Sequence, residues 1–122
     1  MRDAVQERRI FWMLWVAVLA TKLVVAARLP LFVDEAFYWQ EGQHLAAAYS
    51  DLPGLTAWLT RLGRVVGGDH GFAVRLPFLL IASLVPCLMV HIAAREMGAR
   101  AGWVAGCFTL LLPLPGSLDV MA

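Results

Sequence analysis

Three long apolar blocks alternate with stretches that hold most of the charged residues of this 122-residue chain. The blocks cover residues 10–27, 76–94 and 101–118, and Lys22 is the only Asp, Glu, Lys or Arg within them. An α-helix of 18 residues reaches ~27 Å, which is about the thickness of the hydrocarbon layer of a membrane. The pattern therefore predicts three membrane-spanning helices joined by more polar segments.

The segment between the first two blocks, residues 28–75, has a different periodicity. We expect one helix over residues 35–49. A second should begin at Pro53 and end at Gly67 and Gly68, since proline suits a first helical position and glycine a helix end. In this second stretch, PGLTAWLTRLGRVVGG, the apolar residues recur at helical spacing, and Arg61 and Arg64 fall on the other side. Because this helix is amphipathic and too short to cross, we expect it to lie in the membrane interface.

The composition agrees with an all-α membrane protein. Hydrophobic residues make up 61% of the chain and charged residues 16%, with a mean hydropathy of +0.70, which exceeds what the surface of a soluble domain tolerates. A net charge of +1 without a basic stripe argues against nucleic acid as a partner. Cys87 and Cys107 fall in separate predicted spans, where a thiol behaves as a small hydrophobe, so no disulfide is expected.

The distribution of arginine predicts how the chain is oriented, because short cytoplasmic segments accumulate Lys and Arg. Arg2, Arg8 and Arg9 precede the first span, and Arg95 and Arg100 lie between the second and the third. Both segments are therefore placed in the cytoplasm. Residues 28–75, with four arginines against five acids, form the outward-facing loop.

The order of these features resembles one family. A single span, then DEAFYW, then HLAAAYSDLPGLTAWLTRLGRVVGGDHGFAVRLP and a second span are similar to the start of C-type membrane glycosyltransferases. The closest branch contains the protein O-mannosyltransferases and the bacterial aminoarabinose transferases that modify lipid A. The resemblance runs from about Leu29 to Ala122.

This resemblance implies an activity and a setting. Such an enzyme transfers a sugar from a polyprenyl-phosphate donor to a lipid or protein hydroxyl, with inversion of configuration at the anomeric carbon. The reaction takes place on the outer face of the membrane, which is here expected to be a bacterial inner membrane. Enzymes of the family are several hundred residues long, so the chain is expected to be an amino-terminal portion that is inactive by itself. The competing hypothesis is a non-catalytic protein, either a truncated remnant or a small membrane scaffold.

Two adjacent carboxylates are the first candidates for chemistry. A hydroxyl that attacks an anomeric carbon must lose its proton, and a positioned carboxylate can accept it. Asp34 lies just beyond the first span, and by resemblance it matches the catalytic Asp of the family's first outer loop. The alternative is that Asp34 caps the helix that follows. Glu35 is interpreted as a partner of the helix dipole or of a substrate-binding network.

Two further acids are candidates through the resemblance. Asp51 matches a position where some members ligate a divalent metal ion, although it could equally cap the next helix. The family's basic residue and second proline after this acid are replaced here by Leu52 and Gly54. Asp119 follows the third span, which the predicted topology brings to the same face as Asp34. It resembles a second active-site Asp, and the alternative is a solvated carboxylate.

Two basic side chains are candidates for binding the donor phosphate. Lys22 lies inside the first span, where a cation is costly unless it reaches the interface or a partner. Arg75 leads into the second span, and its planar fork could bind a phosphate, bind an acid such as Asp34, or only anchor the helix. No metal cluster is expected from the histidines, which are His44, His70 and His91.

Overall fold

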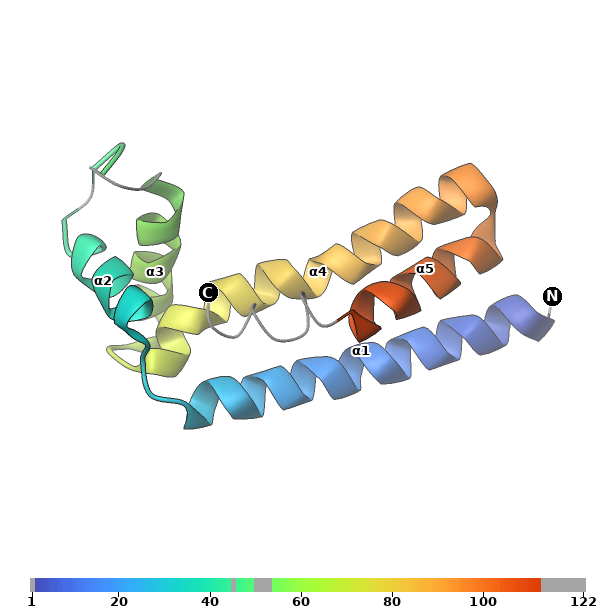
Figure 1. Ribbon diagram of the computed structural model, residues 1–122, viewed down its shortest axis with the longest axis horizontal. Helices are drawn as coiled ribbons and strands as arrows, with labels where there is room; N and C mark the ends of the chain where they lie inside the picture. Colours follow the sequence, from blue (N-terminus) through green and yellow to red (C-terminus); the bar gives the residue numbers. More distant parts are fainter. Residues whose placement is uncertain (1, 45, 50–53, 113–122) are drawn as a thin grey trace.

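A computed structural model of the chain describes residues 2–44, 46–49 and 54–112, and this part is all-helical. It contains five helices: α1 (Arg2–Arg28), α2 (Val33–Glu41), α3 (Gly54–Gly67), α4 (Gly71–Met97) and α5 (Ala99–Leu111). α4 packs against α1, α3 and α5, and α5 also packs against α1 (Figure 1). The short helices α2 and α3 gather at one end of the long pair, and α3 runs across the direction of α1 and α4.

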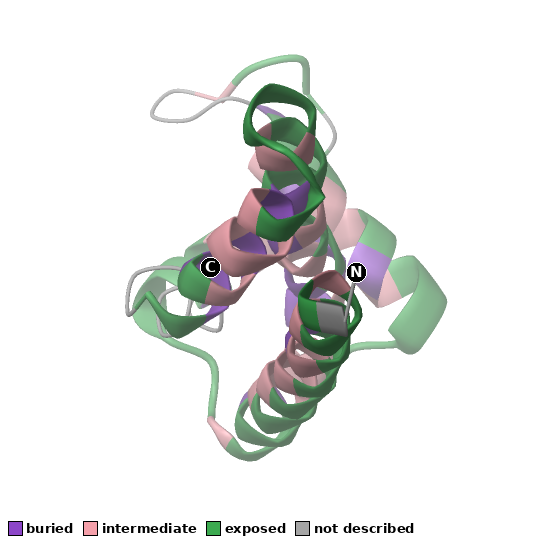
Figure 2. Cartoon of the chain, turned by 90° about the vertical axis from the view of Figure 1, so that its right-hand side faces the viewer, coloured by how far each residue is buried: buried purple, intermediate pink, exposed green. Residues whose placement is uncertain are grey.

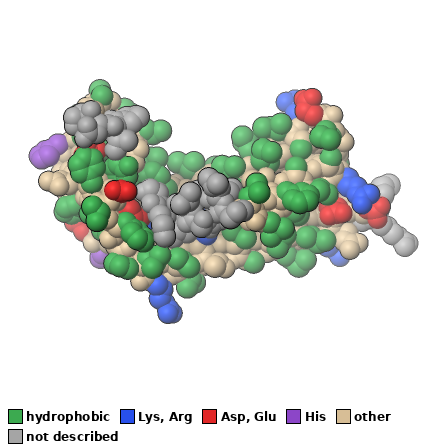
Figure 3. Space-filling view, viewed as in Figure 1, with side chains coloured by type: hydrophobic (Ala, Val, Ile, Leu, Met, Phe, Trp, Pro, Cys, Tyr) green, Lys and Arg blue, Asp and Glu red, His purple; other side chains and the backbone are tan. Residues whose placement is uncertain are grey.

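Two of these helices, α1 and α4, are long and apolar enough to cross a membrane. Each has 27 residues and so extends ~40 Å, which is more than one hydrocarbon thickness. Many of their large apolar side chains are exposed, as expected for surfaces that face lipid. Figure 2 shows how many residues of the helices are exposed, and Figure 3 shows hydrophobic side chains spread over one face of the molecule. Both begin earlier in the chain than the predicted spans, so Arg75 lies inside α4 and not ahead of it.

The third predicted span is not established. α5 has 13 residues, which extend only ~20 Å, and residues 113–118 of the predicted span lie outside the described part. Within the described part, α5 packs closely on its neighbours through glycine. A Cβ at Gly102 would lie 2.7 Å from both the Cβ of Ala94 and the carbonyl oxygen of Val90. Gly106 likewise faces Val90 and the Phe11 ring. The two glycines, which lie four residues apart on one face of α5, therefore allow close helix packing within this chain.

Of the two helices between α1 and α4, α2 ends earlier than predicted, whereas α3 ends where predicted. α2 ends at Glu41 and not at Tyr49, which corrects the predicted helix over residues 35–49. Its C-cap, Gly42, sits so close to α3 that a Cβ there would lie 3.1 Å from the Ala57 carbonyl oxygen. The turn after α2 thus lies directly against α3, on which α2 packs. α3 ends at Gly67 as predicted, whereas Pro53 lies outside the described residues.

The amphipathic character of α3 also has a structural form. Its buried positions are small or short, namely Gly54, Ala57, Thr60 and Gly63. The large apolar residues lie on the opposite side and are exposed: Leu55, Trp58, Leu62, Val65 and Val66. Thus α3 packs on the protein through the face that carries its small side chains, and its large apolar side chains face outward.

Candidate functional site

The C-terminus of α1, the N-terminus of α2 and the first turns of α4 meet at Arg75. The side chain of Arg75 is fully buried, with a relative exposure of 0%. Its Nη1 donates to the carbonyl oxygens of Ala26 (2.8 Å) and Leu29 (2.9 Å), and its Nη2 donates to that of Pro30 (2.8 Å). Ala26 lies in the last turn of α1, where carbonyl oxygens have no partner within the helix, and Leu29 and Pro30 directly follow the helix, so the guanidinium acts as a C-cap supplied by α4.

The remaining donors of Arg75 bind Glu35. Nε donates to Oε1 and Nη2 donates to Oε2, both at 2.6 Å, in a side-on, two-bond ion pair. Glu35 is itself only 2% exposed. A guanidinium has five N–H donors, and here all five are engaged. We call this arrangement of Arg75, Glu35 and the three carbonyls the Arg75 junction.

Glu35 also fixes the start of α2. Its Oε2 accepts a hydrogen bond from the backbone N–H of Phe32 at 2.9 Å, and Phe32 is the N-cap residue of the helix. This is one half of a capping box, in which the third helical residue reaches back to the cap. Asp34, at the second helical position, is therefore not the N-cap, which corrects the alternative considered for it. The acid bound by Arg75 is likewise Glu35 and not Asp34.

Asp34 has a different environment from its neighbour. Its side chain is exposed, and it makes no hydrogen bond or ion pair with any residue in the described ranges. It lies in the first turn of α2, where the partial positive charge of the helix end favours a carboxylate. The Arg75 junction thus holds a turn of helix from which Asp34 projects.

The remaining candidates, Lys22, Asp51 and Asp119, are not part of the Arg75 junction. Lys22 is half-buried on α1 and lines a small cleft between α1, α4 and α5, whose lining also includes Leu79. Asp51 and Asp119 lie outside the described residues. Among the residues that are described, no group of three or more His, Cys, Asp or Glu side chains could hold a metal ion.

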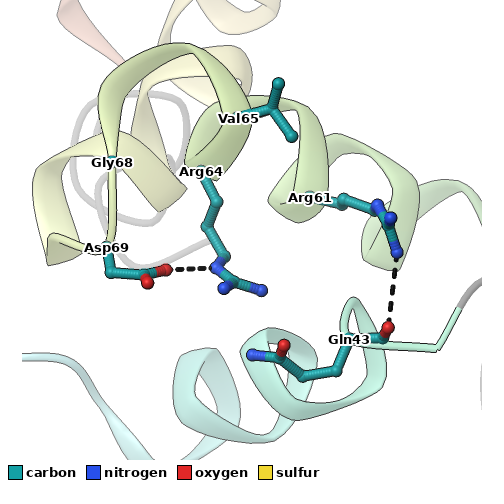
Figure 4. Close-up of a pocket in the computed structure, with 6 residues that line it drawn as sticks. All are labelled: Gln43, Arg61, Arg64, Val65, Gly68 and Asp69. Carbon is teal, nitrogen blue, oxygen red and sulfur yellow. Dashed lines mark hydrogen bonds and ion pairs between the residues drawn. The ribbon is translucent and has the colours of Figure 1, made fainter.

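A second polar feature, not anticipated as a site, lies between the end of α2 and α3. Gln43, Arg61, Arg64 and Asp69 surround a cleft of about 300 Å³ (Figure 4). Arg64 Nε donates to Asp69 Oδ1 at 2.5 Å, and the Arg64 guanidinium carbon lies 4.9 Å from the centre of the Trp39 ring. The hydrogen bond and charge of Arg64 lower the pKa of Asp69 below its ordinary value of 3.8. We call this feature the Arg61–Arg64 cleft.

The sequence contained part of the signal for this cleft. Arg61 and Arg64 fall on the polar side of the predicted helix, and residues three apart lie on the same face of a helix. It did not show that the turn after α2 would bring Gln43 beneath them.

The described part therefore has two helices able to cross a membrane, with a polar, ion-paired end formed by α2, α3 and the start of α4. No protein-family model, curated protein or solved structure matches the chain.

Proposed function

We propose that the chain is the amino-terminal membrane portion of a C-type glycosyltransferase. It would transfer a sugar from a polyprenyl-phosphate donor to a hydroxyl of a lipid or protein acceptor. The observation that carries the proposal is the unequal placement of two adjacent acids, Asp34 and Glu35. Glu35 is buried and bonded to Arg75 in the Arg75 junction. Asp34 is exposed in the first turn of α2, beside the ends of two helices that are long enough to cross a membrane.

The proposed reaction uses Asp34 as a general base. The acceptor hydroxyl oxygen attacks the anomeric carbon and forms the new glycosidic bond, while the bond from that carbon to the donor phosphate breaks. The hydroxyl proton passes to the carboxylate of Asp34, and polyprenyl phosphate leaves with the electron pair of the broken bond. An exposed carboxylate with no ion-pair partner in the described part suits this role, because a paired acid is a weaker base.

The proposed setting is the outer face of a bacterial inner membrane, with the amino terminus in the cytoplasm. α1 then runs outward and delivers Asp34 to the headgroup layer, where a donor lipid presents its phosphate. α3 lies across the direction of α1 and α4, which suits a helix in the plane of the interface. Lys22, about one and a half turns from the end of α1, is proposed to contribute positive charge near that phosphate.

Asp51 and Asp119 complete the proposal through the resemblance. Asp119 is proposed as a second carboxylate of the active site, delivered by a third span. Asp51 is proposed as a ligand of a divalent metal ion that binds the donor. Glu35 and Arg75 are proposed to shape the same site as positioning residues, since all five donors of Arg75 and both carboxylate oxygens of Glu35 already take part in hydrogen bonds.

The test is a sugar-transfer assay in membranes containing the protein that carries this chain. Asp34→Asn keeps the size of the side chain and removes the proton acceptor, so transfer should fall by on the order of 10²-fold or more. Asp3→Asn, which alters an exposed acid at the other end of α1, is the matched control and should have no effect. Undiminished transfer by a well-expressed Asp34→Asn variant would reject the proposal.

A further inference from the structure

The two arginines of the Arg61–Arg64 cleft differ from Arg75 in how far their donors are used. The Nε of Arg64 donates a hydrogen bond to Asp69, and its Nη1 and Nη2 make no hydrogen bond to any described residue. Arg61 uses only Nη1, which reaches the carbonyl oxygens of Gly42 at 3.4 Å and Gln43 at 3.3 Å. Those distances exceed the usual range for such bonds, so they are weak. Both guanidiniums keep donors for a ligand.

The cleft has the charge and size of an anion site. Two arginines against the single carboxylate of Asp69 leave it with a net positive charge, and Gln43 adds a carboxamide at the opposite wall (Figure 4). Its volume of about 300 Å³ is at the lower end for small-molecule sites. Asp69 and the Trp39 ring hold the Arg64 guanidinium in place, which reduces the entropy lost when it binds a ligand.

We propose that the Arg61–Arg64 cleft binds a phosphate group. A phosphate offers several acceptor oxygens to two planar forks, and arginine matches this geometry with paired hydrogen bonds. A carboxylate has fewer oxygens for the same set of donors, and a cation would be repelled. The cleft is not lined by Asp34, Glu35 or Arg75, so the inference does not rest on the proposed glycosyl transfer.

Two sources of phosphate fit this cleft, and they can be separated. Val65 lines the cleft and is 76% exposed on the apolar face of α3, so a membrane lipid could place its headgroup there while its chains follow that face. The other source is a small soluble phosphate ester. Both share the same contacts with Arg61 and Arg64.

The experiment uses the full chain in nanodiscs. In one arm, discs of mixed phosphatidylcholine and phosphatidylglycerol are analysed by native mass spectrometry for lipid retained by the protein. In the other, discs of phosphatidylcholine alone are titrated with glycerol 3-phosphate in a calorimeter. Retention of phosphatidylglycerol identifies a lipid headgroup, and binding of glycerol 3-phosphate identifies a soluble ligand.

Variants test whether the cleft is the site. Arg61→Gln and Arg64→Gln should each weaken binding on the order of tenfold or more, the scale of losing hydrogen bonds to a charged group. Arg28→Gln, which removes the exposed arginine at the end of α1, outside the cleft, is the matched control. Far-UV circular dichroism checks that helix content is retained. Absence of binding in both arms, or equal weakening by Arg28→Gln, would overturn the proposal.

Discussion

Removing one partner of the Arg75 junction should destabilise the protein strongly. In Glu35→Ala, the Arg75 guanidinium stays buried without its counter-ion, and a broken buried pair typically costs about 3–5 kcal/mol. The backbone N–H of Phe32 also loses its acceptor. In Arg75→Ala, Glu35 is left unpaired, and the carbonyls of Ala26, Leu29 and Pro30 lose their donors as well. The bond to the Ala26 carbonyl is buried, so leaving that acceptor unsatisfied adds about 1–3 kcal/mol, whereas the part-buried carbonyls of Leu29 and Pro30 add less because water can reach them. Arg75→Ala should therefore be the more damaging change.

The double variant separates the ion pair from the rest of the junction. Once Arg75 has been removed, removing Glu35 relieves an uncompensated charge. Glu35→Ala/Arg75→Ala should therefore be more stable than the sum of the single changes implies, by about 3 kcal/mol or more. Arg75→Lys is not conservative here, because an ammonium has three donors for five hydrogen bonds.

Stability can be measured by titrating the protein in mild detergent with sodium dodecyl sulfate and following helix content by circular dichroism. Arg64→Ala and Asp69→Ala, separately and together, provide a surface ion pair as control, with a much smaller expected coupling because Asp69 is 64% exposed. The reasoning would be refuted if the Arg75 and Glu35 variants were additive, or were no less stable than these surface variants.

Three further predictions concern the loop between α1 and α4. In a variant without native cysteines, Cys at Ala47 should react with an impermeant maleimide on intact cells, and Cys at Met97 only after lysis; the reverse result would refute the topology. A spin label at Trp58 should report headgroup depth if the exposed apolar face of α3 lies in the membrane interface as proposed, and a label at the bilayer centre would contradict this. Because Arg64 lowers the pKa of Asp69, their pair should stabilise the fold at neutral pH. That stabilisation should be lost only as the pH falls below 3.8 through the lowered value, and a carboxyl NMR titration midpoint at or above 3.8 would oppose it.

Much of the helical arrangement could be predicted from the sequence because its signals are local. The period of apolar residues and the glycine pair at its end located α3, and long apolar runs located α1 and α4. The length of α2 was misjudged because Ala46–Ala48 favours helix. Directly after the end of α2, Gly42 lies close to Ala57 of α3, which is a tertiary contact. Local propensity cannot contain that information.

The sequence singled out both charged residues of the Arg75 junction as candidates, but it did not predict that they would bind each other. Arg75 and Glu35 were both singled out, yet they are 40 residues apart and no periodicity relates them. From the sequence, Arg75 could bind a phosphate, bind an acid such as Asp34, or only anchor the helix, and nothing in the sequence pointed to Glu35 as its partner. The choice depends on which side of α2 faces α4, and this in turn depends on how the loop after α1 enters the helix.

The separation of Asp34 from Glu35 follows from the geometry of one helical turn. Successive helical residues point about 100° apart, so two adjacent acids cannot both face the same guanidinium. α1 ends with carbonyls that need donors, and Arg75 supplies them from a buried position. A buried cation needs a counter-ion, and Glu35 provides it while also capping α2. Asp34 is then the acid left over, pointing outward from a turn fixed to both membrane-length helices. The backbone of that turn is fixed, while the Asp34 carboxylate makes no hydrogen bond within the described residues and keeps its lone pairs for a substrate, as the proposed general base would need.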